Sequence, residues 1–128
     1  MYVGKMMMDK AKVWLTIDSE KKARLYIRYA NERMDAAEEL MSLGRVELAM
    51  KTAAKGAGYL KLASEELSKV GDRELINLWA DMEIATYVHE DLLKKFEEAA
   101  GGGEDIVLDQ LCDEVVLVRE KAEVQLAK

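Results

Sequence analysis

Residues 45–70 read RVELAMKTAAKGAGYLKLASEELSKV, and the spacing of apolar residues in this stretch decides the fold class. Apolar or small side chains recur at every third or fourth position: Val46, Met50, Ala53, Ala57, Leu60, Ser64, Leu67 and Val70. Because an α-helix makes one turn in about 3.6 residues, these side chains fall along one face. The spacing therefore predicts a long helix that packs lengthwise against other helices at an angle of about 20°.

Three further segments carry a stripe of the same kind. Residues 73–100 repeat the spacing at Leu75, Trp79, Met82, Thr86, His89, Leu93, Phe96 and Ala100. Residues 104–127 repeat it at Leu108, Cys112, Val115, Arg119, Ala122 and Leu126. Residues 19–43 carry a wider apolar face, made by Leu25, Tyr26, Tyr29, Ala30, Met34, Ala36, Ala37, Leu40, Met41 and Leu43. The opposite face of that segment is polar and should be exposed: Arg24, Arg28, Asn31, Glu32, Asp35, Glu38, Glu39 and Ser42. We expect this helix to contact two or more neighbours.

Glycines divide the chain into these segments, and the chain contains no proline. Gly44, Gly71 and the glycine run at 101–103 stand where helices commonly end, while an interior proline would cost about 3 kcal/mol. Asp18 and Asp72 are suitable N-cap residues. We predict an all-α fold in one domain, residues 1–128: an up-down antiparallel bundle of four long helices with a short N-terminal helix. The helices are expected near 3–15, 19–43, 45–70, 73–100 and 104–127.

Composition and charge exclude several functions. With one cysteine and one histidine, the chain cannot form an internal disulfide or supply a zinc-finger ligand set. Residues 1–71 hold 13 Lys/Arg and 10 Asp/Glu, whereas residues 72–128 hold 6 and 15. The acidic half argues against nucleic-acid binding, which needs clustered positive charge. The asymmetry is explained either by basic helices lying beside acidic ones or by an acidic docking face for a cationic partner.

No stretch reaches the ~18 apolar residues of a membrane-spanning helix. Residues 1–17 contain Lys5, Asp9, Lys10 and Lys12, so they lack the apolar core of a signal peptide. We therefore expect neither a transmembrane segment nor a signal peptide in this chain.

The beginning of the chain resembles a known family. Residues 2–40 read YVGKMMMDKAKVWLTIDSEKKARLYIRYANERMDAAEEL. The turn Leu15-Thr16-Ile17-Asp18 and the helical core from Ala30 to Ala37 are similar to the start of bacterial domain-of-unknown-function family 5667, over about residues 2–43. The resemblance implies an extracytoplasmic location, since members are usually exported or membrane-tethered. It implies no activity and no catalytic residue.

Two side chains on predicted inner faces could carry chemistry. Arg33 lies within the apolar arc of its helix, and a buried guanidinium needs an acidic or carbonyl partner, such as Glu83 or Asp113. An exposed head group or a ligand contact is the alternative. His89 is expected to be a core histidine bonded to a neighbouring helix; a phosphotransfer histidine and a metal ligand are the alternatives.

The remaining candidates lie in the last two helices and at two glycines. Asp105, Asp109 and Asp113 form a ladder that either binds a cation or simply places acids near a helix N-terminus. Cys112 is expected to be a buried small hydrophobic residue. Gly56 and Gly58 are costly inside a helix, which indicates close approach of a neighbouring helix, a local bend, or a shallow groove for a ligand or peptide.

The sequence as a whole favours a non-catalytic interaction or scaffold domain, working at a bacterial cell envelope. Its partner would be another protein or a second copy of the chain. We expect no catalytic residue, no metal and no cofactor, and the chain is not expected to be an enzyme. The alternative is a helical bundle that binds a cation or a small ligand through Arg33, His89 or the aspartate ladder.

Overall fold

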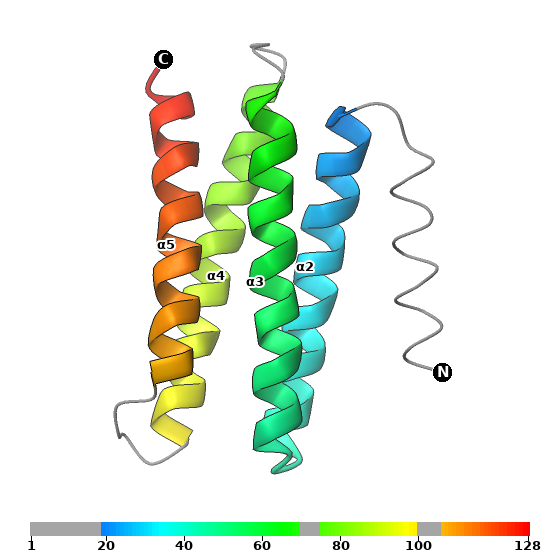
Figure 1. Cartoon of the computed structure of the whole chain (residues 1–128), viewed down its shortest axis with the longest axis vertical. Coiled ribbons are helices and arrows are strands. Elements are labelled where there is room, and N and C mark those ends of the chain that lie inside the picture. Colours follow the sequence, from blue (N-terminus) through cyan, green and yellow to red (C-terminus); the bar gives the residue numbers. More distant parts are fainter. Residues whose placement is uncertain (1–18, 70–74, 100–105) are drawn as a thin grey trace.

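The computed structural model describes residues 19–69, 75–99 and 106–128. These residues form α2 (Ser19–Ser42), α3 (Val46–Ser68), α4 (Ile76–Ala99) and α5 (Ile106–Leu126), with no strand among them. Consecutive helices run in opposite directions along one long axis (Figure 1). The predicted all-α bundle is therefore confirmed, and all four helices begin and end within three residues of their predicted bounds. The predicted short helix near 3–15 lies outside the described residues.

The turn between α2 and α3 is set by one glycine. Gly44 has a φ of +76°, a conformation that side chains with a Cβ rarely adopt. Its N–H donates to the carbonyl of Met41 at 3.0 Å, and the Arg45 N–H donates to the carbonyl of Leu40 at 2.9 Å. These two bonds are those of a Schellman motif, which satisfies the last carbonyls of a helix. Gly44 thus ends α2 as the sequence predicts.

The predicted seams face inward, except at Val46, the first residue of α3, which is 38% exposed. Leu60, Met82 and Val115 are each at most 1% exposed, and Leu67, Leu93 and Leu108 are equally buried. The buried side chains form one cluster toward the α2 N-terminus, around Leu60 and Trp79, and a second around Met34 and Phe96. The wide face of α2 is also confirmed in its centre, but Leu43 is 68% exposed because it follows the end of the helix. Ile27, which the predicted stripe omitted, is buried.

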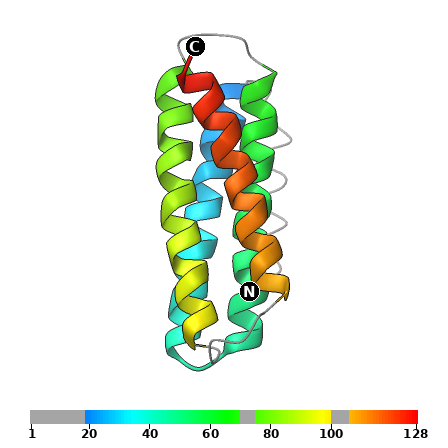
Figure 2. The same ribbon diagram turned by 90° about the vertical axis from the view of Figure 1, so that its left-hand side faces the viewer.

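The bundle consists of two closely packed hairpins. The most extensive contacts join α2 to α3 and α4 to α5, and contacts along α3/α5 and α2/α4 are fewer. Small residues explain the first pair, because Ala23, Ala30 and Ala37 on α2 are fully buried, as are Ala53 and Ala63 on α3. Viewed from the side on which α5 lies, α5 stands in front between α4 and α3, with α2 behind, so α2 and α5 are diagonally opposed (Figure 2). The two thinner seams therefore lie on opposite sides of the bundle.

None of the helices in the described part of the chain is both long and apolar enough to cross a lipid bilayer.

Candidate functional site

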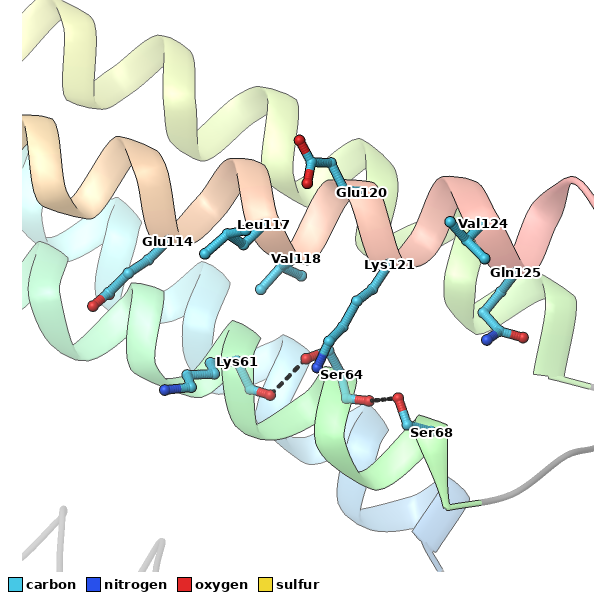
Figure 3. A pocket seen from close by; sticks show the side chains of 10 residues that line it. All are labelled: Lys61, Ser64, Ser68, Glu114, Leu117, Val118, Glu120, Lys121, Val124 and Gln125. Carbon is cyan, nitrogen blue, oxygen red and sulfur yellow. Dashed lines mark hydrogen bonds between the residues drawn. The ribbon is translucent and has the colours of Figure 1, made fainter.

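A groove of about 550 Å³ runs along the seam between α3 and α5 (Figure 3). We call it the α3/α5 groove. It is lined on α3 by Lys61, Ser64 and Ser68, and on α5 by Glu114, Leu117, Val118, Glu120, Lys121, Val124 and Gln125. Val118 is buried at its base, while Leu117 and Val124 are 60% and 59% exposed. Two large apolar side chains, seven residues apart on one helix, are thus open to solvent beside a concave surface.

The groove exists because α3 presents little side-chain volume to α5 at this level. The Ser64 hydroxyl donates to the carbonyl of Lys61 at 2.7 Å, and the Ser68 hydroxyl donates to the carbonyl of Ser64 at 2.7 Å. Both hydroxyls therefore turn back onto their own helix instead of reaching across the seam (Figure 3). Serine side chains are too short to fill the space that a leucine would occupy between two helices.

Charges of both signs border the α3/α5 groove. Lys61 and Lys121 supply two cations, and Glu114 and Glu120 supply two carboxylates. All four residues are exposed, so each charge is hydrated and worth little by itself. An apolar floor with a mixed charged rim is the usual composition of a surface that binds another protein segment.

A second groove, of about 410 Å³, runs along the opposite seam between α2 and α4. We call it the α2/α4 groove. Its apolar lining is Ile27, Met34, Ile84, Ala85, Val88 and Leu92, and its polar lining is Asn31, Asp35, Asp81 and His89. Ile84 and Val88 are 62% and 52% exposed. The lining contains two carboxylates and no lysine or arginine.

His89 lies at the base of the α2/α4 groove and is 1% exposed. Its Nε2 is 2.9 Å from Oδ1 of Asn31 on α2. Burial lowers the pKa of His89 to about 4, so the ring is neutral at pH 7. Since an amide oxygen only accepts, Nε2 carries the proton and donates it, and Nδ1 is buried with no hydrogen-bond partner in the described residues. The predicted bond from His89 to a neighbouring helix is confirmed, and the ring does not lie on an exposed face.

Asn31 is the partner that sequence reasoning missed. It was placed on the exposed polar face of α2, and it is indeed exposed, but its side chain also bonds the buried ring of His89. The two residues are 58 positions apart. The signal in the sequence that could have suggested this bond is an asparagine at the edge of the polar face, one turn from the apolar Ile27.

Arg119 is the second residue whose role the sequence did not show. Its Nε donates to the hydroxyl of Thr86 at 3.2 Å, and its Nη2 donates to the carbonyl of Thr86 at 3.2 Å and to Glu90 Oε1 at 3.3 Å. The guanidinium carbon also lies 3.8 Å from the ring centroid of Tyr87. These contacts bind α5 to α4 through a largely buried cation. In the sequence, the indication of this role was the position of the charged Arg119 within the apolar stripe of residues 104–127.

Arg33 is buried as predicted, at 3% exposed. It lies on the side of α2 that faces α3, since a Cβ added at Gly56 would be 3.5 Å from the Cβ of Arg33. Asp113 is exposed on α5, diagonally across the bundle. The predicted ion pair of Arg33 with an acid such as Glu83 or Asp113 stays a prediction.

The aspartate ladder is not assembled into a site in this part of the chain. Asp109 and Asp113 are exposed on α5, and Asp105 lies outside the described residues. Across residues 19–69, 75–99 and 106–128, no three His, Cys, Asp or Glu side chains are grouped to hold a metal ion. Cys112 is half-buried rather than buried; its pKa is raised by burial and by the charges of Glu90 and Glu97.

The chain matches the sequence model of the family described as "Domain of unknown function (DUF5667)" over residues 1–125. The match extends far beyond residues 2–43, to which the resemblance was first assigned. No curated protein and no solved structure matches the chain significantly. The family match covers both grooves and all four helices of the described bundle, and this chain therefore belongs to the DUF5667 family.

Proposed function

We propose that this protein is a non-catalytic interaction domain, and that its α3/α5 groove binds an amphipathic helix of a partner protein. The observation that carries the proposal is the exposure of Leu117 and Val124 along a concave, mostly apolar surface. An amphipathic helix bound in an apolar groove is a recurring mode of protein recognition, in which anchors at helical spacing fill the groove.

The dimensions of the groove fit such a segment. The lining of α5 extends from Glu114 to Gln125, which is about 17 Å at a rise of 1.5 Å per residue. A partner helix of about three turns would span it. Covering Leu117 and Val124, each more than half exposed, would contribute roughly 1–2 kcal/mol per side chain. The charged rim would then set the orientation of the bound helix more than its affinity.

The positions of the two most reactive side chains support a non-catalytic role. The ring of His89 is enclosed and bonded to Asn31, whereas a general base must reach the proton that it removes. The raised pKa of Cys112 keeps its thiol protonated at pH 7, and the thiolate is the nucleophilic form. We propose the bacterial cell envelope as the location for this role, because the resemblance of residues 2–43 to the family implies an extracytoplasmic location.

Site-specific photocrosslinking in the producing cell tests the proposal. A photoreactive phenylalanine would replace Leu117 or Val124 in the groove, and Ile106 would be the control. Ile106 lies on the same helix and is 72% exposed, but it does not line the groove. We expect one discrete protein adduct from Leu117 and Val124 that is absent from Ile106.

The possible outcomes separate the alternatives. An adduct of two copies of this chain would show that the groove mediates self-association instead of binding a different protein. Equal labelling from all three positions, or no adduct from the groove, would contradict the proposal.

A further inference from the structure

The α2/α4 groove differs from the α3/α5 groove in its charge. Its acidic lining residues are Asp35 on α2 and Asp81 on α4, and both are exposed. The only other titratable lining residue is the neutral His89. Between the two carboxylates lie exposed apolar side chains, of which Ile84 and Val88 are the largest contributors to the open surface. The groove therefore combines an apolar strip with acidic positions and no cation.

The distance between the two carboxylates follows from the register of the helices. α2 and α4 run in the same direction (Figure 1), and the bond between Asn31 and His89 fixes the level at which they meet. Asp81 precedes His89 by eight residues, and Asp35 follows Asn31 by four. At 1.5 Å per residue, the two acids are about 18 Å apart along the bundle axis. They thus lie toward opposite ends of the groove.

We infer that the α2/α4 groove binds a basic amphipathic helix of a partner protein, with cationic residues about 11 positions apart. Eleven residues make about three helical turns and about 16.5 Å, so such cations share one face and match the spacing of Asp81 and Asp35. The apolar stripe between the cations would cover Ile84 and Val88. This site is on the opposite side of the bundle from the α3/α5 groove, so the inference stands or fails independently of the proposed function.

A pair of designed peptides provides the probe. Each has 18 residues, a leucine stripe on one face, and two charged residues 11 positions apart beside that stripe. The first carries lysine at both charged positions, and the second carries glutamate there. Binding to the full chain would be followed by fluorescence anisotropy at fixed ionic strength. We expect the lysine peptide to bind at least tenfold more tightly than the glutamate peptide.

Variants of exposed residues locate the binding site without threatening the fold. Asp35→Asn with Asp81→Asn removes both carboxylates and should weaken binding of the lysine peptide about fivefold, since an exposed ion pair is worth roughly 0.2–1 kcal/mol. The matched control is Glu98→Gln with Asp113→Asn. It removes the same charge at exposed positions outside both grooves and should change binding less than twofold. Ile84→Ser with Val88→Ser should weaken binding at least tenfold.

Three results would overturn the inference. The first is an equal loss of lysine-peptide affinity in the two charge variants, which would show that the peptide is attracted to the acidic second half of the chain as a whole. The second is undiminished binding to the chain that carries Ile84→Ser and Val88→Ser. The third is equal affinity for a lysine peptide whose charged residues are only four positions apart.

Discussion

The two glycines inside α3 differ in what surrounds them, and substitution by alanine should therefore have different effects on stability. At Gly58 an added Cβ would meet no atom within 4 Å beyond its chain neighbours and the backbone of its own helix. Gly58→Ala should raise the free energy of unfolding by about 1 kcal/mol, the difference in helix propensity between the two residues. At Gly56 the same methyl group would lie 3.2 Å from the carbonyl oxygen of Ala30 and 3.5 Å from the side chains of Arg33 and Met34.

The contact with Ala30 is the decisive one because it is made by backbone. To relieve this close contact, α2 would have to move away from α3 by a few tenths of an ångström along an interface of fully buried alanines. We expect this cost to cancel or exceed the gain in propensity, so that Gly56→Ala is neutral or destabilising. The two variants should then differ by about 1–2 kcal/mol.

Urea unfolding followed by circular dichroism measures the difference, with unchanged m-values as the control for two-state behaviour. Gly58→Ala should also raise Tm by about 4 °C. If Gly56→Ala stabilises the protein as much as Gly58→Ala does, α2 and α3 do not approach as closely as described, and the explanation of the hairpin by small residues fails.

Three further predictions concern the polar side chains. The pKa of His89 is lowered from its ordinary value of 6.5 to about 4. Between pH 6.5 and 4 the unfolded chain binds a proton at His89 and the folded chain does not, so the free energy of unfolding should fall as the pH falls, by up to about 3 kcal/mol. Urea titrations at several pH values measure this decrease, and His89→Gln should lack it. Arg119→Met should lower the free energy of unfolding by about 1–3 kcal/mol, and a double-mutant cycle with Glu90→Gln should show coupling; additive effects would mean that the pair contributes nothing. Calorimetry with Mg²⁺ or Ca²⁺ should give no binding heat, whereas heat that disappears in Asp109→Ala would favour the cation-binding alternative.

Periodicity and glycine positions were sufficient to predict the helices and their inner faces. Leu60, Met82 and Val115 are each buried at the centre of a predicted stripe, because the repeat of apolar residues along a segment fixes which side of its helix is apolar. Gly44 ends α2 by a local hydrogen-bond pattern, which also depends only on neighbouring residues. Properties determined within one helix were therefore accessible from the sequence.

Properties that depend on how helices are arranged were not accessible. Asn31 meets His89 because α2 lies beside α4, and Arg119 meets Glu90 because α5 lies beside α4 in one particular register. Arg33 was expected to face an acid such as Glu83 or Asp113, but its Cβ lies on the side of α2 that packs against α3. Stripe positions predict burial without identifying the neighbouring helix, so pairs that are distant in sequence remained undetermined.

The grooves were the least predictable feature. Both arise at the seams between two closely packed hairpins, and the α3/α5 groove depends on two serines whose hydroxyls bond their own helix. In the sequence, Ser64 was simply a small member of a buried stripe. That the two serines leave space unfilled can be recognised only when the position of α5 relative to α3 is known.

Filling the α3/α5 groove tests the central claim most directly. Ser68 is exposed at the edge of the groove, so Ser68→Trp would place a large ring over its apolar floor without entering the core. The measurement is the yield of the photocrosslinked adduct from Val124 in this variant, together with its thermal unfolding. We predict unchanged unfolding and a yield reduced to that of the Ile106 control. Unchanged unfolding with an undiminished yield would show that partners do not bind in this groove.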